Sequence, residues 1–439
     1  MIDLSLFCSD LRGEILGSNS SIFKLRDLQK LSLSHIDFSG SPIHSAIGDL
    51  VNLNQLSLSH CGISGDIPST ISHLSKLVYL HIDSDSRMRL DPYTWNNLIH
   101  NATDLREIFL FGVNMSSGEE ISLPLLSNLS SSLVSLHLLD AQIQGKWPTD
   151  ILRLPNLQEI DLSSNENLRG ELPNSNWTTS LRFLYLSGTA FSGNIPDSIA
   201  HLTFLNKLDL SGCNFYGFLP PSLFNLTQLS VLDFSDNKLV GPIPTQITKL
   251  SKLLYLYLPG NMLNGLIPRW CYSLSSLLLL DLSRNQLTGS IGEFSTNSLQ
   301  YLLLSDNKLQ GSFPNSIFQL QNLTYLSLSS TYLSGIVDFH QFSNVRALVY
   351  LDLSHNSWLS LNFEDDFDCI LSNLQYLFLS SSNLSSFPNF LAPYLQVLDI
   401  SRNELSGDIS SALCNINTLC NQLGSQQLDW TYPKMLGNI

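Results

Sequence analysis

The sequence predicts an α/β-type repeat solenoid, a right-handed superhelix with a parallel β-sheet on its concave side and few helices. The first observation is a leucine that recurs in steps of 24 residues, at Leu133, Leu157, Leu181, Leu205, Leu229, Leu253 and Leu277. The second is that each of these leucines opens the pattern Leu-x-x-Leu-x-Leu. The third is a turn segment, x-x-Asn-x-Leu-x-Gly, that follows this pattern in successive repeats. Repeats of this length stack as coils around one continuous core.

The joined template, Leu-x-x-Leu-x-Leu-x-x-Asn-x-Leu-x-Gly, is the signature of a leucine-rich repeat. It spans four successive blocks without gaps: 205–217, 229–241, 253–265 and 277–289. With the partial matches from Leu4 to Leu395, the chain holds about seventeen coils. The leucines of Leu-x-Leu should point inward and stack in columns, as at Leu208, Leu232 and Leu256, each stabilising the fold by about 1.5–3 kcal/mol. The alternate residues should point outward, because side chains alternate along a strand.

An asparagine recurs in the turn after the strand, and we expect its amide to satisfy backbone groups there as a buried ladder. The ladder positions are Asn165, Asn237, Asn261, Asn285, Asn307, Asn356 and Asn403. Cys61 and Cys213 occupy the same column and are interpreted as inert substitutes. The motif Gly-x-Ile/Leu-Pro then follows, as in Gly193–Pro196. Glycine permits a tight backbone path, and proline ends a short second strand because it has no N–H to donate.

The repeat predicts one solenoid over residues 1–413, followed by a degenerate final repeat over residues 414–439. Two irregular insertions break the period, near residues 85–104 and near 354–373, and the second contains the acidic run at 362–368. Insertions in solenoids map to loops along one edge. Stacked strands provide an extended recognition surface without a deep enclosed pocket.

The composition excludes several classes of function. The 439 residues include only 13% charged side chains and carry a net charge of −15, which argues against a nucleic-acid partner. No apolar run reaches the roughly 18 residues of a membrane span, and residues 1–6 do not form a signal peptide. The seven cysteines contain no CxxC pair, and no hydrolase, metalloprotease, Walker or kinase motif occurs. We therefore expect no enzymatic activity, no cofactor and no metal.

Eight sequons of the form Asn-x-Ser/Thr are candidate glycosylation sites and suit a secreted protein. They lie at Asn19, Asn101, Asn114, Asn128, Asn176, Asn225, Asn322 and Asn383. The alternative interpretation is chance, because the chain is rich in asparagine and serine.

Four tyrosines share the column just before Leu-x-Leu on four successive coils: Tyr301, Tyr325, Tyr350 and Tyr376. At the spacing of a β-sheet they would form an outward aromatic stripe about 14 Å long. Tyrosine is favoured at binding surfaces, although it also suits strands in general. The candidate ligand-binding residues of the concave face are these four together with Tyr255 and Tyr257.

Two further columns favour structural interpretations. Cys8, His35 and His60 share a column, but the outer two residues would lie about 10 Å apart, too far to meet on one zinc ion. The histidines are therefore interpreted as exposed residues of a polar face. The aspartate of Leu-Asp-Leu recurs too regularly for a pair of catalytic carboxylates and is interpreted as a repeat feature. Its positions are Asp161, Asp209, Asp233, Asp281, Asp352 and Asp399.

Three stretches resemble one known family. Cys8–Gly13 with Asn19–Leu25 looks like that family's first repeat, and Phe38–Ile43 follows as it does there. The insertion from Asp91 to Asn114 is similar to the family's irregular fourth and fifth repeats. With the plant-specific Gly-x-Ile-Pro form of the repeat, the chain resembles the plant leucine-rich repeat receptor-like proteins, the group of the tomato Cf-type disease-resistance proteins.

The resemblance implies a receptor ectodomain on the extracellular face of the plasma membrane, acting in defence or development. Such receptors bind an extracellular protein or peptide, often derived from a pathogen, and signal through a receptor-like kinase adaptor and a coreceptor kinase. The chain departs from the family by lacking a signal peptide, a Cys-rich cap, an island loop and a membrane span, so we expect a truncated ectodomain that does not signal alone. The alternatives are a soluble repeat-protein inhibitor of a pathogen wall-degrading enzyme and a non-functional gene fragment.

Overall fold

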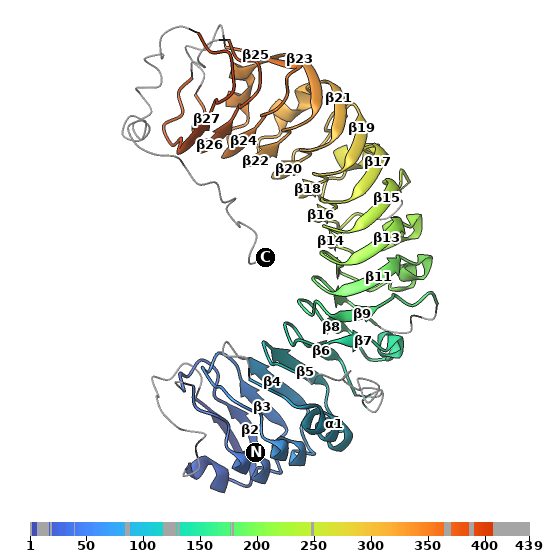
Figure 1. The fold of residues 1–439 in the computed structure, drawn as a ribbon, viewed down its shortest axis with the longest axis vertical. Coiled ribbons are helices and arrows are strands. Elements are labelled where there is room, and N and C mark those ends of the chain that lie inside the picture. The colour runs from blue at the N-terminus through green and yellow to red at the C-terminus, as the bar shows by residue number, and fades with distance from the viewer. Residues whose placement is uncertain are drawn as a thin grey trace. The chain divides into compact units, whose positions relative to one another are not determined.

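The structure is a computed structural model that divides into two compact units, residues 1–287 (unit 1) and 288–439 (unit 2). It describes residues 2–6, 17, 20–38, 40–83, 88–116, 129, 132–175, 177, 180–246, 250–363, 370–385 and 390–406. The predicted final repeat, residues 414–439, lies outside the described residues. In each unit the strands of successive coils lie next to one another along the repeat (Figure 1).

The first sheet of unit 1 contains the Leu-x-Leu strands, all of them parallel. Its strands are β1 (Ile2–Ser5), β2 (Leu28–Ser32), β3 (Gln55–Leu58), β4 (Tyr79–Asp83), β5 (Glu107–Phe111), β6 (Ser135–His137), β8 (Glu159–Asp161), β10 (Phe183–Tyr185), β12 (Lys207–Asp209), β14 (Val231–Asp233), β16 (Tyr255–Tyr257) and β18 (Leu279–Asp281). Leu208 lies opposite Leu232, and Leu232 lies opposite Leu256. All three side chains are fully buried, which confirms the predicted column and its inward register.

The short second strands that the sequence predicts are present, and in unit 1 they assemble into a second parallel sheet. They are β7 (Gly145–Lys146), β9 (Leu168–Gly170), β11 (Ala190–Asn194), β13 (Asn214–Phe218), β15 (Lys238–Pro242) and β17 (Met262–Leu266). Gly241 shows why the motif requires glycine. Its φ is +81°, and a Cβ atom there would lie 2.3 Å from the ring of Phe218. A larger residue would therefore meet both backbone strain and a clash.

Unit 2 repeats the same two-sheet arrangement. Its first sheet contains β20 (Tyr301–Leu303), β22 (Tyr325–Ser327), β24 (Tyr350–Asp352), β26 (Tyr376–Phe378) and β27 (Val397–Asp399). Its second sheet contains β21 (Lys308–Ser312), β23 (Tyr332–Asp338) and β25 (Leu359–Asn362), and Thr288 and Gly289 of β19 (Gln286–Gly289) pair with β21.

Helices are few, as predicted. Within the described part of the chain the α-helix is α1 (Pro92–Asn101), which fills the first insertion. It begins at Asp91, whose carboxylate accepts a hydrogen bond from the N–H of Thr94 at 3.0 Å, and proline occupies its first turn. Several other coils return through 3₁₀ helices: η1 (Ser21–Lys24), η2 (Ser45–Asp49), η3 (Ser69–His73), η5 (Thr149–Arg153), η6 (Asp197–His201), η7 (Pro221–Asn225), η8 (Arg269–Tyr272), η9 (Asn315–Gln319) and η10 (Phe339–Asn344). In the described residues, none of these helices has the length and apolar character to cross a membrane.

The asparagine ladder is present as predicted. The amide nitrogen of Asn237 donates to the carbonyl of Leu210, one coil earlier, at 2.8 Å, and to two carbonyls of its own turn. Its Oδ1 accepts from the N–H of Phe215, also one coil earlier, at 3.0 Å. Asn237 therefore joins two coils through groups that would otherwise be buried without partners.

The two cysteines of this column are inert, as predicted. Cys61 donates from Sγ to the carbonyl of Leu33 at 3.0 Å, and Cys213 donates to that of Leu186 at 3.0 Å. Burial raises the pKa of the Cys61 thiol to about 11 and also raises the pKa of Cys213. Both thiols therefore stay protonated at neutral pH and serve as hydrogen-bond donors.

Candidate ligand-binding surface

The first sheet of unit 2 brings the predicted tyrosines together. Tyr301, Tyr325, Tyr350 and Tyr376 lie opposite one another on adjacent strands. The centroids of successive rings are 6.3, 3.8 and 6.1 Å apart, and the middle pair is stacked at an interplanar angle of 5°. All four side chains are half-buried. They form a continuous aromatic surface, named here the tyrosine stripe.

One ring that the sequence analysis did not single out extends this surface. The ring of Phe378, two residues after Tyr376 on β26, lies 5.2 Å from that of Tyr350. The hydroxyl of Tyr376 donates to Oε1 of Gln396 at 3.0 Å, which orients the last ring of the stripe. Phe378 occupies the outward position after the first leucine of Leu-x-Leu, so period-2 alternation was the signal that could have found it.

Tyr255 and Tyr257 belong to unit 1, where both lie on β16 and point to the same side of the sheet. Their rings are 6.5 Å apart and nearly parallel, at 6°. On β10 of the same sheet, Phe183 and Tyr185 repeat this arrangement at 6.3 Å and 6°. The predicted pair is therefore one of two matching ring pairs in this unit.

A cluster of rings near the start of unit 1 was missed in the sequence. His81, Phe109 and His137 lie opposite one another on β4, β5 and β6, with ring centroids 5.4 and 4.6 Å apart. Tyr79 contacts both His81 and Phe109. Burial, together with His60 and His137, lowers the pKa of His81, so this imidazole is neutral at neutral pH. The irregular steps around the first insertion hid the common column of these residues.

The recurrent aspartates lie on the outward face, and the structure shows what they do there. Oδ1 of Asp209 accepts hydrogen bonds from the backbone N–H and the hydroxyl of Ser211, at 2.9 and 2.7 Å. Asp233 and Ser235 repeat the arrangement, as do Asp281 and Ser283. The backbone bond to the residue two positions later also occurs at Asp161, Asp352 and Asp399. The aspartate thus satisfies the backbone where the chain leaves the strand, which explains its recurrence.

Asp233 gives the stability of the protein a pH dependence. Burial, and after it the neighbouring carboxylate of Asp209, raise the pKa of Asp233 to about 7, and Asp281 adds to the effect. The folded state therefore holds this proton more tightly than the unfolded state, so stability falls as pH rises from about 4 to about 7.

We expect Asp233→Asn to stabilise the fold at pH 8 by about 1–2 kcal/mol, after allowance for solvent screening, and to give no gain at pH 4. The amide oxygen of Asn can still accept from Ser235. Urea unfolding from pH 4 to pH 8 measures the effect, with Asp197→Asn on η6 as the exposed control. A gain that is the same at both pH values would contradict the assignment.

The histidine column does not assemble a metal site among the residues that the structure places. The rings of His35 and His60 are 4.9 Å apart, and Nδ1 of His60 pairs with the carboxylate of Asp83. Cys8, the third member of the column, lies outside the described residues. No group of three metal-ligating side chains occurs in the described ranges.

The sequons differ in accessibility. Asn101, Asn225, Asn322 and Asn383 are exposed, and Asn114 is half-buried. The side-chain amides of Asn101, Asn322 and Asn383 donate to the carbonyls of Ser72, Asn297 and Ser357 at 2.9–3.0 Å. Asn19, Asn128 and Asn176 lie outside the described residues. Glycosylation at the exposed positions stays a prediction.

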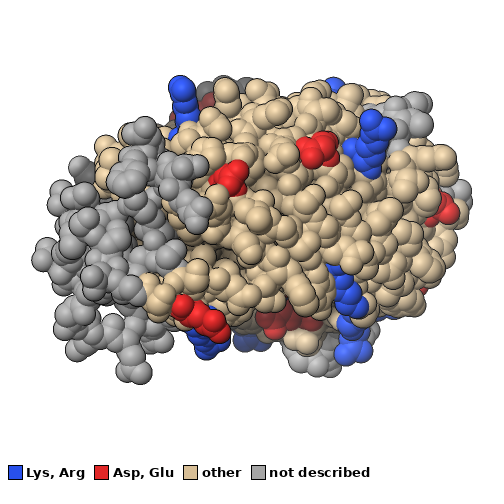
Figure 2. Space-filling model, turned by 90° about the horizontal axis from the view of Figure 1, so that it is seen from above, with Lys and Arg blue, Asp and Glu red and all other residues tan. Residues whose placement is uncertain are grey.

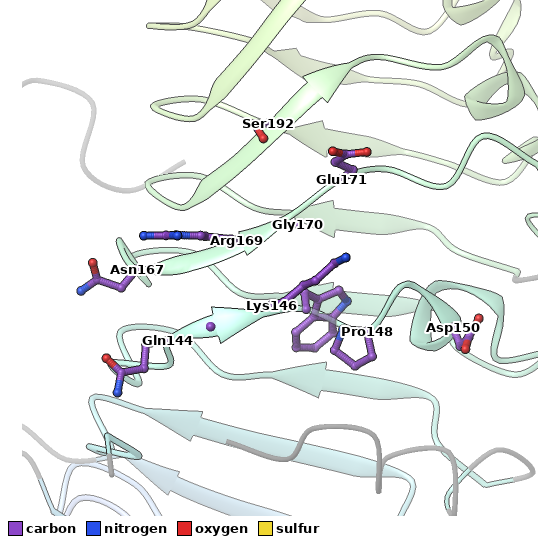
Figure 3. A pocket seen from close by; sticks show the side chains of 11 residues that line it. Gln144, Lys146, Pro148, Asp150, Asn167, Arg169, Gly170, Glu171 and Ser192 are labelled. Carbon is purple, nitrogen blue, oxygen red and sulfur yellow. The ribbon is translucent and has the colours of Figure 1, made fainter. Parts of the chain in front are cut away.

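An open groove of about 1010 Å³ lies over the second sheet of unit 1, at β7, β9 and β11. Gln144 and Asn167 lie at one end and Asp150 at the other, with Lys146 and Arg169 between them (Figure 3). The groove therefore mixes cations, carboxylates and amides and favours no single class of ligand. Over the face drawn in Figure 2, charged side chains likewise lie apart among uncharged residues.

Two family models match the sequence, both described as leucine-rich repeat. One covers residues 227–287 and 297–357, and the other covers 52–74, 180–202, 204–226 and 394–416. Most of these segments coincide with the coils described above.

Several plant proteins are similar in sequence to about half of the chain. Receptor-like protein Cf-9 of Solanum pimpinellifolium is 43% identical over 207 residues, which are 47% of this chain and 23% of that protein. Receptor-like protein 6 of Arabidopsis thaliana is 34% identical over 211 residues, which are 47% of this chain and 21% of that protein. The matched part thus spans about a quarter of the length of these relatives.

Solved structures share the fold over nearly the whole chain. The plant peptide hormone receptor RGFR1, in complex with RGF2, matches with a TM-score of 0.77 and 27% identity, over 94% of this chain and 73% of that one. The Arabidopsis receptor kinase HAESA, in complex with the peptide hormone IDA and the co-receptor SERK1, matches with a TM-score of 0.60 and 26% identity, over 93% and 70%. The sequence repeats, the coils with two sheets and the similar proteins all indicate the same fold, a leucine-rich repeat solenoid. The chain is a leucine-rich repeat protein and is similar to the plant leucine-rich repeat receptor-like proteins.

Proposed function

We propose that the chain is the ligand-binding part of a plant cell-surface receptor and recognises an extracellular peptide on the exposed face of its first sheets. The observation that carries this proposal is the tyrosine stripe, in which four half-buried rings line up on adjacent strands. Such rings offer a large contact area, and little side-chain entropy is lost when they are covered.

The shape of the surface supports a peptide as the ligand. Neighbouring strands are about 4.8 Å apart, so four rings cover about 14 Å, the length of four or five extended residues. The surface is open rather than enclosed, which suits a chain that lies across the coils. RGFR1 is a peptide hormone receptor and HAESA is bound to a peptide hormone in its structure, which supports the same class of ligand here.

Signalling would require partners, and the relatives suggest which kind. The HAESA structure includes a co-receptor, SERK1. We propose that the full-length protein lies at the plasma membrane with this region outside the cell, and that it signals through a receptor-like kinase adaptor and a coreceptor kinase in defence or development.

The stripe is tested by replacing Tyr301, Tyr325 and Tyr350 together by alanine. Peptides that bind the wild-type protein are first selected from a library, and their Kd values are then measured by calorimetry. We expect binding to weaken at least about tenfold, since each buried ring contributes on the order of 1 kcal/mol or more. The melting temperature should change little, because the rings point away from the leucine core.

Tyr332→Ala is the matched control, because Tyr332 lies on β23 of the other sheet and is 57% exposed. The control should bind as the wild type does. Equal affinities of the triple variant and the control would reject the stripe as the binding surface.

A further inference from the structure

One outward column of unit 1 has an ordered sequence of side chains. Across β8, β10, β12, β14, β16 and β18 it reads Asp161, Tyr185, Asp209, Asp233, Tyr257 and Asp281. Each tyrosine lies in register between two aspartates, and the triad of aspartate, tyrosine and aspartate occurs twice, three strands apart. We name the two triads by their tyrosines, the Tyr185 triad and the Tyr257 triad.

Each triad includes a second ring. Phe183 accompanies Tyr185 and Tyr255 accompanies Tyr257, two residues earlier on the same strand. The ring centroids are 6.3 and 6.5 Å apart, and both pairs have an interplanar angle of 6°. All four rings are half-buried. The two triads therefore present the same combination of flat aromatic surface and flanking carboxylates.

The carboxylates are held in place by hydrogen bonds. Oδ1 of Asp209, Asp233 and Asp281 accepts from the serine two residues later, which orients each group at the end of its strand. Within the described residues, no lysine or arginine forms an ion pair with any of these three aspartates. Lys207 shares β12 with Asp209, and Arg284 follows Asp281 beyond the strand end.

Burial, together with repulsion between neighbouring carboxylates, raises pKa values in this column. The pKa of Asp233 is raised by burial and by Asp209, and the pKa of Tyr185 is raised to about 12 by burial and by Asp161, Asp209 and Glu159. A cation placed on this column would relieve that repulsion and would be attracted by the ring faces as well.

We propose that this face of unit 1 binds an extended basic peptide, with one arginine side chain at the Tyr185 triad and a second at the Tyr257 triad. Each guanidinium stacks on the ring and donates hydrogen bonds to the flanking carboxylates. Arginine fits better than lysine, because its planar group can stack and donate to both sides at once. The inference rests on the proposed peptide-binding function and adds the chemical class of the ligand.

The spacing of the triads specifies the spacing of the arginines. The tyrosines are three strand steps apart, about 14 Å at the usual separation of about 4.8 Å. An extended peptide advances about 3.4 Å per residue, and residues four positions apart point to the same side. The favoured ligand therefore has arginines at positions i and i+4.

The inference is tested with synthetic peptides that differ only in their charged residues and in the spacing of those residues. The probe is a fluorescent peptide with two arginines separated by three glycine or serine residues. Its comparison peptides carry adjacent arginines, lysines at i and i+4, citrullines, or glutamates at i and i+4. Fluorescence anisotropy with the 439-residue protein gives each Kd at about 0.15 M salt, where screening limits non-specific attraction.

We expect the i and i+4 arginine peptide to bind at least about tenfold more tightly than the citrulline and glutamate peptides, and several-fold more tightly than the adjacent-arginine peptide. Tyr185→Leu and Asp209→Asn should each weaken it about fivefold or more. Asp197→Asn removes a carboxylate from η6 and should bind as the wild type does. Thermal melts identify any variant that fails to fold. If both triad variants unfold, Tyr257→Leu and Asp281→Asn test the other triad in the same way.

Two results would overturn the inference alone, and a third would overturn the proposed function with it. One is equal affinity for all peptides with two arginines, unaffected by the triad variants, which indicates general attraction to an acidic protein. The other is binding of neutral peptides through the tyrosine stripe without any preference for arginine, which leaves the proposed function in place. A protein that binds no library peptide and no arginine peptide contradicts both proposals.

Discussion

We expect Leu232→Asp to unfold several neighbouring coils of unit 1. Leu232 is fully buried, and its partners in the column, Leu208 and Leu256, are also fully buried. The substitution removes an apolar side chain and introduces a carboxylate that finds no cation in the leucine column. The loss of buried leucine amounts to about 2–5 kcal/mol, and an unpaired buried charge adds several more. This total is comparable to the whole stability of a typical domain.

The loss should spread along the chain because each coil depends on its neighbours for its hydrogen bonds and core. Circular dichroism should show reduced strand signal at room temperature, or a melt that begins far below that of the wild type. Leu232→Met is the control for volume and should cost less than about 1.5 kcal/mol. Asp233→Ala, one residue away on the outward face, should also be mild, because it removes two bonds to Ser235 and relieves the repulsion with Asp209. Equal melts for Leu232→Asp and Asp233→Ala would show that the register of β14 is wrong.

The second large effect is expected at the asparagine ladder, for Asn261→Leu. The amide of Asn261 donates to the carbonyls of Phe234, Leu258 and Pro259, and its Oδ1 accepts from the N–H of Leu239. Leucine has a similar size but no polar atoms, so these buried backbone groups would lose their partner. We expect a cost of about 3–5 kcal/mol, since each buried unsatisfied group costs about 1–3 kcal/mol and the groups form one network.

Asn261→Cys is the matched comparison, because this column already contains two cysteines. Cys61 and Cys213 each donate from Sγ to a carbonyl of the previous coil at 3.0 Å. Cysteine at 261 would keep one donor and would lose the second amide N–H and the acceptor for Leu239, so we expect a smaller cost than for leucine, about 1–2 kcal/mol. Urea unfolding under reducing conditions gives both values. If leucine proved as well tolerated as cysteine, the ladder would be a matter of shape and not of hydrogen bonding.

The sequence predicted much of the candidate surface because the repeat converts positions along the chain into neighbours in space. Tyr301, Tyr325, Tyr350 and Tyr376 occupy the same position in four coils, and the structure places them opposite one another. The same rule could have found the alternating aspartates and tyrosines of unit 1, which occupy one position in six coils. That order was missed because the aspartates were considered apart from the tyrosines.

Interactions that depend on distances between side chains of different coils could be identified only from the tertiary structure. The cluster of His81, Phe109 and His137 crosses irregular steps of the repeat, so no constant period connects these residues. The groove over β7, β9 and β11 could be located only once the pairing of the second strands was known. These strands are too short to show a sequence period of their own.

By itself, the sequence determined the coil, the inward leucine columns and the asparagine ladder, because each follows from one residue type at one repeated position. Only the tertiary structure decided how the outward side chains interact. The orientation of a ring, the burial of Asp233 and the acidity of its carboxyl depend on which side chains the neighbouring coils present. A surface property of this kind depends on side chains from several coils together, whereas the fold follows from a pattern that is complete within each coil.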